Sequence, residues 1–346
     1  MNNIILSTST IIEALRKLNE LSGKEMTLFV VDEANVMLGT VTDGDIRRAL
    51  LHGCELASSI TEAMHQNFKA LAAGDIDVAK IKDYRNRGIK LIPVIDDSGR
   101  LTSTINLDTC ITKLPLSAIL MAGGKGERLR PLTLDTPKPL LPIGGRAIID
   151  YNISALHQCG IEDITVTTNY LAEKIVGHFA GTTVKCIKEP TFLGTIGSAA
   201  LADIPSNGCT IVMNSDLLTT ISYEDMYLHH VSVGADITIA AIPYQVSVPF
   251  AILSVNPEDQ SLIDGLTEKP SYSYFANAGI YIFPNELLKS LPLNQRTDAP
   301  DLIEQAIHDG MKVSYFPING TWIDIGSPSD FKQANELMKT IKGFNK

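Results

Sequence analysis

Three apolar segments in the last two thirds of the chain restrict its possible fold more than any other feature. They are SAILMA (117–122), DITVTTN (163–169) and CTIVMNS (209–215), and segments with a helical pattern lie between them, at 146–160 and 195–202. Apolar strands that alternate with helices are typical of a parallel sheet that helices cover on both sides. The sequence therefore predicts an α/β fold with a Rossmann-like, mainly parallel sheet.

The segments that follow predict how this sheet continues. Strand patterns recur at 236–242, 250–255, 262–267 and 273–283, with few helical patterns between them. Consecutive strands without crossover helices pair in antiparallel fashion, so we expect a mixed sheet with an antiparallel extension. The last element we expect is an amphipathic helix from Ser329, and we assign residues 117–346 to one domain.

The first 112 residues carry a different pattern, which occurs twice. Residues 27–50 predict strand, turn, strand and helix, and residues 90–111 repeat the first part of this order about 64 residues later. A helical segment precedes each copy. A duplication this short predicts two small α/β modules that share a core. We place the copies at about 1–57 and 58–112 and a linker at 113–116.

Composition excludes several classes of function. The net charge of −10 argues against a nucleic-acid partner. No apolar run approaches the ~18 residues of a membrane span, and the first residues lack the basic head and cleavage site of a signal peptide. Five scattered cysteines without a C-x-x-C pair are typical of reduced thiols. We expect a cytoplasmic homo-oligomer with no membrane partner.

A glycine-rich loop with concentrated positive charge follows the first apolar strand. The loop begins after Ala122, and Lys125, Arg128 and Arg130 lie within six positions of one another. Parallel α/β sheets bind phosphates beyond the carboxyl ends of their strands. Leu129 stands where a dinucleotide fingerprint needs its third glycine, and the Gly-Lys-Ser/Thr of a P-loop is absent. We therefore expect backbone N–H groups and these cations to hold phosphates in another way.

The loop also carries a family resemblance. AGGKGERLRPLT with TPKPLLPIGG (122–145) resembles the signature of the sugar-nucleotide pyrophosphorylases, the nucleotidyltransferases that join an NTP to a sugar 1-phosphate. Further matches, in family order, are EPTFLGTIGSAALA (189–202), NSD (214–216), EKP (268–270), NAGIYIF (277–283) and WIDIG (322–326). The resemblance covers residues 116 to 335 and implies a GT-A-like nucleotide-diphospho-sugar transferase fold. Glu127 and the pair Asn214–Ser215 depart from the usual pattern.

The resemblance implies a role for each matched residue. The loop residues are expected to bind the nucleotide, Arg128 and Lys138 to act on its phosphates during catalysis, and two acids to hold Mg²⁺, an ion that prefers carboxylates and water. The nucleotide-binding residues are Ala122, Gly123, Gly124, Lys125, Gly126, Gly194 and Thr195; the sugar-phosphate residues are Glu268, Lys269, Asn277 and Gly279; the metal ligands are Asp216 and Asp324. Each residue alone could be a surface charge or a turn residue.

The first of the two N-terminal modules carries a second resemblance. LGTVTDGDIRRALLHG (38–53) resembles the turn and helix of a CBS domain, so residues 1–112 are similar to a tandem CBS pair. Such pairs bind adenosine-type nucleotides, which implies that Thr42 and Asp45 contact an adenine or guanine nucleotide with a regulatory role. In the second copy Thr109 stands where Asp45 would map, so we expect one site at most. The alternative is a pair that only dimerises or supports the enzyme.

These observations predict a Mg²⁺-dependent enzyme that converts NTP and sugar 1-phosphate to NDP-sugar and pyrophosphate. A CBS pair ahead of this domain resembles guanylyltransferases of bacterial nonulosonic (legionaminic) acid and heptose pathways. That implies GTP with glucosamine, mannose or heptose 1-phosphate, for surface-glycan synthesis. The alternatives are a thymidylyl-, uridylyl- or cytidylyltransferase and a non-catalytic nucleotide-sugar sensor. The missing third glycine disfavours dinucleotide-dependent redox chemistry.

Overall fold

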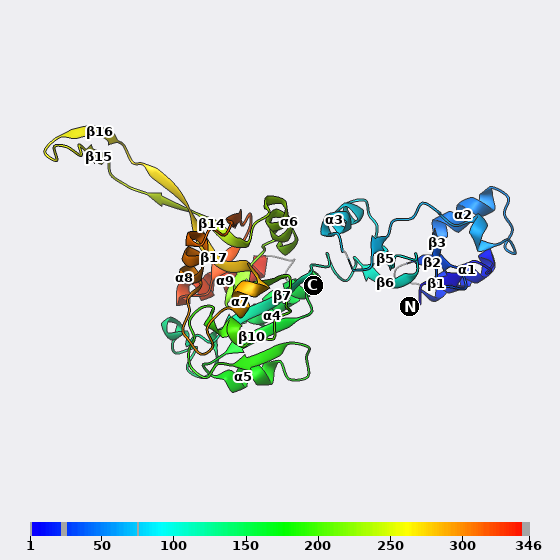
Figure 1. Cartoon of the computed structure of the whole chain (residues 1–346), viewed down its shortest axis with the longest axis horizontal. Helices are drawn as coiled ribbons and strands as arrows, with labels where there is room; N and C mark the ends of the chain where they lie inside the picture. Colours follow the sequence, from blue (N-terminus) through cyan, green and yellow to red (C-terminus); the bar gives the residue numbers. More distant parts are fainter. Residues whose placement is uncertain (1, 22–25, 75, 341–346) are drawn as a thin grey trace. The chain divides into compact units, whose positions relative to one another are not determined.

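The computed structural model describes residues 2–21, 26–74 and 76–340 and divides into two compact units. Unit 1 comprises Met1–Pro115 with His157–Gly160, and unit 2 comprises Leu116–Leu156 with Ile161–Lys346. The elements of both units are labelled in Figure 1. Since the two units are separate bodies, each is described by itself.

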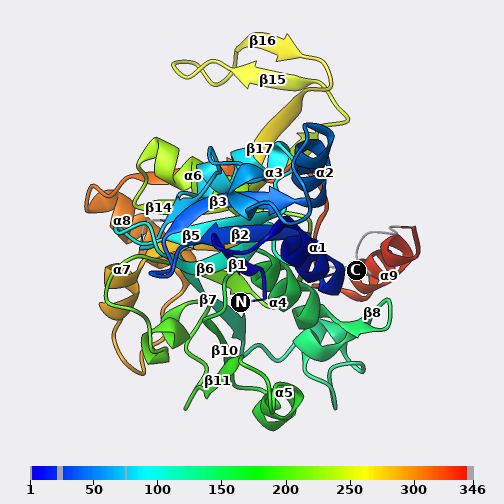
Figure 2. The same cartoon turned by 90° about the vertical axis from the view of Figure 1, so that its right-hand side faces the viewer.

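Unit 1 contains two small sheets with the same topology. In each sheet the first strand pairs in parallel with the second, and the second pairs in antiparallel fashion with the third, as β2 and β3 show in Figure 2. The first sheet has β1 (Ile4–Leu6), β2 (Thr27–Val31) and β3 (Met37–Thr42), and the second has β4 (Leu71–Ala72), β5 (Leu91–Ile95) and β6 (Leu101–Asn106). A register shift follows Val30 in one sheet and Val94 in the other, so even this irregularity recurs at the 64-residue spacing.

The helices of unit 1 show where the two modules differ. The helices are α1 (Ile11–Glu20), α2 (Asp43–Leu51) and α3 (Val78–Asn86), with a 3-10 turn η1 at Ile60–Glu62. A capping box of Thr10 and Glu13 begins α1, which buries Ile11, Ala14 and Leu18. Among the described residues, the second module has no helix after β6; there the side chain of Asn106 accepts the N–H of Asp108.

Unit 2 is built on a seven-stranded sheet in the order β11-β10-β7-β12-β17-β14-β18. All strands except β17 run in one direction, which confirms the mixed, mainly parallel sheet. The strands are β7 (Leu116–Ala122), β10 (Ile164–Thr168), β11 (Lys185–Lys188), β12 (Cys209–Asn214), β14 (Ile237–Ser247), β17 (Ser271–Pro284) and β18 (Val313–Pro317). Three short pairs lie outside the sheet in the described residues: β8 (Pro142–Ile143) with β9 (Arg146–Ala147), β13 (Leu217–Thr219) with β19 (Trp322–Asp324), and β15 (Ile252–Val255) with β16 (Ile263–Thr267).

Helices cover both faces of this sheet. Alternate residues of the central strands, such as Ile119, Val212 and Tyr281, pack with η4, α7 and α8, and the residues between them, such as Leu120, are buried as well. The helices are α4 (Ile148–Gln158), α5 (Ala172–His178), α6 (Tyr223–Val233), α7 (Asn285–Lys289), α8 (Ala299–His308) and α9 (Pro328–Thr340), with 3-10 turns η2 (Glu127–Leu129), η3 (Lys138–Leu140) and η4 (Gly197–Leu201). None of the helices in the described residues has the length and apolar character that crossing a bilayer requires.

The expected antiparallel extension takes the form of a two-stranded arm, defined here as residues 243–275. Strands β14 and β17 continue past the sheet as a ribbon, and β15 (Ile252–Val255) pairs with β16 (Ile263–Thr267) beyond it. Figure 1 shows the ribbon in yellow, extending away from the rest of unit 2. Most of its side chains are exposed.

Candidate active site

Two acids from distant parts of unit 2 meet at the carboxyl end of the central strands. Asp216 follows β12, and Asp324 is the last residue of β19. The short antiparallel pairing of β13 with β19 places Asp324 directly opposite Leu217, the residue after Asp216. The N–H of Ile325 also donates to the carbonyl of Asp216, at 3.2 Å. The fold therefore holds the two expected metal ligands side by side.

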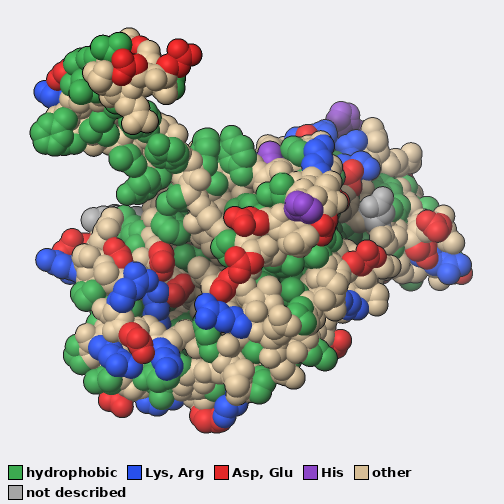
Figure 3. Space-filling model, turned by 60° about the vertical axis from the view of Figure 1, so that its left-hand side comes forward, with side chains coloured by type: hydrophobic (Ala, Val, Ile, Leu, Met, Phe, Trp, Pro, Cys, Tyr) green, Lys and Arg blue, Asp and Glu red, His purple; other side chains and the backbone are tan. Residues whose placement is uncertain are grey.

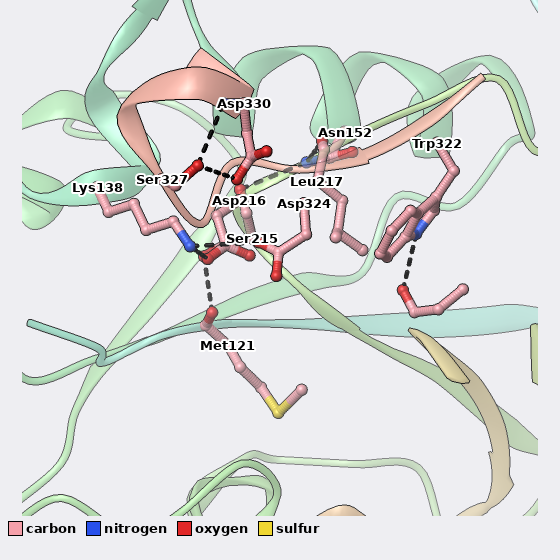
Figure 4. A network of polar contacts seen from close by, with 11 residues as sticks. Met121, Lys138, Asn152, Ser215, Asp216, Leu217, Trp322, Asp324, Ser327 and Asp330 are labelled. Atoms are coloured by element: carbon pink, nitrogen blue, oxygen red, sulfur yellow. Dashed lines mark hydrogen bonds and ion pairs between the residues drawn. The ribbon is translucent and has the colours of Figure 1, made fainter. Parts of the chain in front are cut away.

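Lys138 lies between these two carboxylates. Its ammonium group contacts Asp216 Oδ2 and lies 3.3 Å from Asp324 Oδ1, as Figure 4 shows. The side chain is 12% exposed and comes from η3, in the Thr-Pro-Lys-Pro segment. One cation is thus shared by two acids in a largely buried position, where an ion pair is screened much less than at the surface.

The surroundings of the Asp216 carboxylate favour the binding of a cation. Burial raises the pKa of its carboxyl above the usual range, and the ammonium of Lys138 opposes that effect. Its Oδ2 contacts Lys138, but its buried Oδ1 has no hydrogen-bond partner among the described residues. Asp324 supplies the second carboxylate. The described residues hold no cluster of three or more acid, histidine or cysteine ligands, so phosphate oxygens and waters would complete the shell, as Mg²⁺ sites normally allow.

Buried polar contacts fix the turn that carries Asp216. The amide of Asn152, on α4, donates to the carbonyls of Ser215 and Leu217. The hydroxyl of Ser215 donates to the carbonyl of Met121, the last but one residue of β7, at 2.6 Å. The Ser215 side chain therefore ties β12 to β7. Asn152 was missed from the sequence, because a contact across 63 residues leaves no local signal.

The glycine loop, Lys138 and Asp216 line a cavity of about 390 Å³. Its lining residues are Gly124, Lys125, Gly126, Glu127, Arg128, Leu129, Lys138, Asp216 and Gly326. The guanidinium of Arg128 lies against Gly326, where an added Cβ would meet it at 3.2 Å. Gly126 has a φ of 61°, a backbone conformation that favours glycine, at the turn that leads into η2. Arg130, by contrast, lies at the surface and pairs with Glu127 at 3.6 Å. This cavity combines cations with acids and suits a polyphosphate with a metal ion.

A second cavity of about 190 Å³ shares Gly124, Lys138 and Asp216 with the first. Its other lining residues include Ala122, Gly123, Glu189, Phe192, Gly194, Thr195 and Asn214. Glu189 is 4% exposed, and burial raises the pKa of its carboxyl. Its Oε2 accepts the N–H of Leu193 at 3.1 Å, and Oε1 lies against Gly123. Sequence reasoning did not single out Glu189, although it begins the matched segment EPTFLG.

Gly194 and Thr195 are positioned by the start of α8. Gly194 has a φ of 82°, and an added Cβ would meet the carbonyl oxygen of Thr297 at 2.4 Å. The N–H of Thr195 donates to Asp298, and the hydroxyl of Thr195 accepts the N–H of Ala299. The two residues therefore form a rigid wall of the smaller cavity.

The four residues expected to bind the sugar phosphate have different positions. Asn277 and Gly279 lie on β17, where the Asn277 side chain accepts the N–H of Gly279. Gly279 lies against Asn214, which lines the smaller cavity. Glu268 and Lys269 lie on the arm, with side chains 67% and 69% exposed. None of the four residues lines either cavity, and Gly279 reaches the site through its contact with Asn214.

In unit 1 the expected nucleotide contacts, Thr42 and Asp45, cap helix α2. The Asp45 carboxylate accepts the N–H and the hydroxyl of Thr42 through Oδ2, and its Oδ1 pairs with Arg48. The Thr42 hydroxyl in turn accepts the N–H of Asp45 at 3.3 Å. This capping box explains both side chains by their role at the start of α2, without a ligand. Their proposed contact with a nucleotide stays a prediction.

Comparison with known families defines the class of protein. Residues 117–340 match the nucleotidyl transferase family, and the chain belongs to it. Residues 4–52 match the CBS domain family, which covers the first module of unit 1. The resemblance read from the glycine loop is thereby confirmed.

Particular relatives match about three fifths of the chain. A mannose-1-phosphate guanyltransferase from Gibberella zeae is 30% identical over 227 residues, and one from Pichia angusta is 32% identical over 231; each match covers 62% of both chains. The chain therefore spans about three fifths of the length of these relatives. A solved structure from Bacillus anthracis, assigned as a glucose-1-phosphate thymidylyltransferase, superposes with a TM-score of 0.52 at 23% identity, over 65% of this chain and 96% of that one. This last likeness shows the fold alone.

Proposed function

We propose that this chain is a sugar-1-phosphate nucleotidyltransferase that uses GTP. The observation that carries the proposal is the position of Lys138 between Asp216 and Asp324, where two cavities of suitable size for a triphosphate and a base meet. Membership of the nucleotidyl transferase family supports it. The reaction converts NTP and sugar 1-phosphate to NDP-sugar and pyrophosphate.

The reaction needs charge stabilisation more than proton transfer. An oxygen of the sugar phosphate attacks the α-phosphorus, the bond from that phosphorus to the bridging oxygen breaks, and pyrophosphate leaves with the electron pair. The nucleophile is already an anion at neutral pH, so no general base is required. Catalysis then consists of aligning two polyanions and stabilising charge on the transferred group. In this proposal Arg128 holds the leaving phosphates and Lys138 turns from the acids to the α-phosphate.

A divalent cation fits the two acids. Asp216 and Asp324 would hold it, and the unpartnered Oδ1 of Asp216 is the specific observation that favours this role. Such an ion neutralises phosphate charge and orients the triphosphate when bound. Mg²⁺ is the ion we propose, since carboxylate oxygens with retained waters match its preference.

The buried carboxylate of Glu189 favours guanine as the base. A carboxylate only accepts hydrogen bonds, and guanine presents two adjacent donors, N1–H and the 2-amino group. Thymine and uracil present one N–H between two carbonyl oxygens, which a second carboxylate oxygen would repel. Adenine and cytosine each place an acceptor beside the amino group. Because Glu189 lines the smaller cavity, GTP suits this site better than the other triphosphates.

The sugar is proposed from the relatives. Mannose 1-phosphate comes first, since mannose-1-phosphate guanyltransferases are among the similar proteins. Heptose 1-phosphate and glucosamine 1-phosphate are the next candidates, with products that serve surface-glycan or nonulosonic acid synthesis. Asn277, and Gly279 beside Asn214, are the residues we propose to face the sugar.

A pyrophosphate-release panel tests the proposal. The full-length protein is incubated with each of GTP, ATP, UTP, CTP and dTTP, with Mg²⁺ and each sugar 1-phosphate in turn. We expect the fastest release with GTP, and none when Mg²⁺ is omitted. Turnover with another triphosphate alone would overturn the choice of base but not the reaction class. Absence of release with every pair would favour a non-catalytic nucleotide-sugar sensor.

A further inference from the structure

The arm exposes an unusual amount of apolar surface. Within the described residues, twelve of its large hydrophobic side chains are more than a third exposed: Tyr244, Val246, Phe250, Ile252, Leu253, Val255, Leu262, Ile263, Leu266, Tyr272, Tyr274 and Phe275. Figure 3 shows hydrophobic side chains gathered along this projecting ribbon. The largest exposed apolar patch of a monomer is normally about 300–600 Å². A ribbon with this much exposed apolar surface is expected to pack against a partner.

Beyond the pair Pro243–Phe275, the apolar side chains of the inner ribbon lie on one face. Directly opposed residues of an antiparallel pair share a face, and successive residues alternate between faces. The pairs on one face are Tyr244–Tyr274 and Val246–Tyr272. The other face carries Pro243–Phe275 next to the sheet, where the Phe275 ring contacts Tyr315, and then Gln245–Ser273 and Ser247–Ser271. Beyond Pro243–Phe275, one face is therefore aromatic and aliphatic, whereas the other is polar. This alternation is typical of a ribbon with one face packed and one face in water.

The outer ribbon repeats the pattern. The pairs on its apolar face are Leu253–Leu266 and Val255–Ile263, and the pairs on its other face are Ile252–Thr267 and Ser254–Gly265. A bulge between Ser254 and Val255 keeps the apolar residues together on the first face. A two-stranded ribbon alone is only marginally stable in water, so both ribbons require a packing partner.

Unit 2 does not itself supply that partner. The pairing of β14 with β17 runs unbroken from Ala241–Asn277 inside the sheet to Ser247–Ser271 on the arm. The only register shift in this pair of strands precedes Ala241 and lies within the sheet. The partner of the ribbon must therefore lie outside the sheet of unit 2.

We infer that the partner is the arm of a second copy of this chain. The eight apolar-face side chains are about 40–60% exposed, which leaves roughly 700–800 Å² uncovered, close to the ~800 Å² that each partner contributes to a standard interface. The paired positions on these faces carry no charge; the charged residues of the arm, Glu258, Asp259, Asp264, Glu268 and Lys269, lie at its tip, bulge and turn. Two identical faces can thus meet without burying a charge, as an isologous dimer requires.

Photocrosslinking tests which face meets the second copy. A benzophenone side chain, p-benzoylphenylalanine, replaces Tyr244, Tyr272 or Tyr274 on the aromatic face, and Gln245 or Ser273 as matched controls on the polar face. The full-length protein is irradiated as a mixture of isotopically light and heavy copies. We expect light–heavy crosslinks from the three aromatic-face positions that map to residues 243–275, and few from the controls. Absent crosslinks, equal crosslinking from both faces, or crosslinks that map outside the arm would overturn the proposal.

Analytical ultracentrifugation gives the size of the effect. The triple variant Y244S/Y272S/Y274S removes the aromatic face while it leaves the buried residues of unit 2 unchanged, and Q245A/S273A is its control. Because interface tyrosines commonly contribute strongly, we expect the dimer dissociation constant to rise at least about 100-fold in the triple variant and less than about threefold in the control. Circular dichroism checks that both variants stay folded. A folded triple variant that associates as strongly as the wild type would contradict the inference, whichever reaction the enzyme catalyses.

Discussion

The sequence predicts a ligand-binding carboxylate at two turns, Asp45 for a nucleotide and Asp216 for a metal ion, and the structure gives the two carboxylates opposite environments. In unit 1 both oxygens of Asp45 are engaged, one by Thr42 and the other by Arg48, so the carboxylate is explained as a helix cap. In unit 2 the side chain of Asp216, at the end of β12, is 20% exposed, and its buried Oδ1 has no hydrogen-bond partner among the described residues. The two motifs look equally functional in the sequence.

The difference teaches how to tell a binding carboxylate from a structural one. A buried acceptor without a partner costs about 1–3 kcal/mol, so a protein keeps one where a ligand repays the cost. A capping carboxylate stabilises its own helix with no ligand present. We therefore expect substitutions near Asp216 to change activity and metal binding, and substitutions at Asp45 to change mainly stability.

The largest effect is expected at Arg128. Arg128→Ala removes a guanidinium from the larger cavity, and the loss of one such charge contact lowers turnover by roughly 10²–10³-fold. Arg130→Ala is the matched control, because Arg130 lies at the surface and pairs with Glu127. Steady-state pyrophosphate release measures both variants. Equal losses in the two variants would mean that the loop acts through its overall charge.

Lys138 offers a test of the shared acids that does not rely on activity alone. Lys138→Met should lower turnover about 100-fold. It should also strengthen Mn²⁺ binding in the absence of nucleotide by on the order of tenfold, because the two carboxylates lose the cation that now lies between them. Electron paramagnetic resonance of free Mn²⁺ measures this binding. Lys125→Met, which leaves both ion pairs of Lys138 in place, should bind Mn²⁺ as the wild type does.

Glu189 should show a conflict between function and stability. Burial raises the pKa of the Glu189 carboxyl, so the folded state binds the carboxyl proton more strongly than the unfolded state. The free energy of unfolding therefore falls as pH rises above about 4.3, the pKa of this carboxyl in the unfolded chain. Glu189→Gln removes the carboxylate charge and keeps an acceptor for Leu193. We expect it to raise the melting temperature by about 2–4 °C at pH 7 and to leave it unchanged below pH 4.

The same variant tests the choice of base. A glutamine presents a donor where the carboxylate had only acceptors, so kcat/KM for GTP should fall by at least about tenfold relative to the other triphosphates. Thermal scans across pH and the triphosphate panel measure the two effects separately. A variant with unchanged base preference would show that Glu189 only supports the loop around Leu193.

How much of this could be predicted from the sequence depends on the range of each contact. Short motifs that can be recognised in a single sequence predicted Arg128, Lys138 and the two acids. Asn152 was missed because its bonds to the Asp216 turn join α4 to residues far along the chain. The strands of the arm were predicted, but the exposure of Glu268 and Lys269 follows from the unbroken β14–β17 register, which no short motif records.

The smallest effect is expected at the cap of α2, and it completes the comparison. Asp45→Ala should lower the free energy of unfolding by about 1 kcal/mol, because the N–H of Thr42 loses its acceptor. Asp43→Ala is the control, since the exposed pair of Asp43 with Arg47 contributes only about 0.3–0.5 kcal/mol. Urea titrations measure both. Calorimetry with AMP then separates the two roles, because a heat of binding that disappears only in Asp45→Ala would give this carboxylate a ligand as well as a helix to cap.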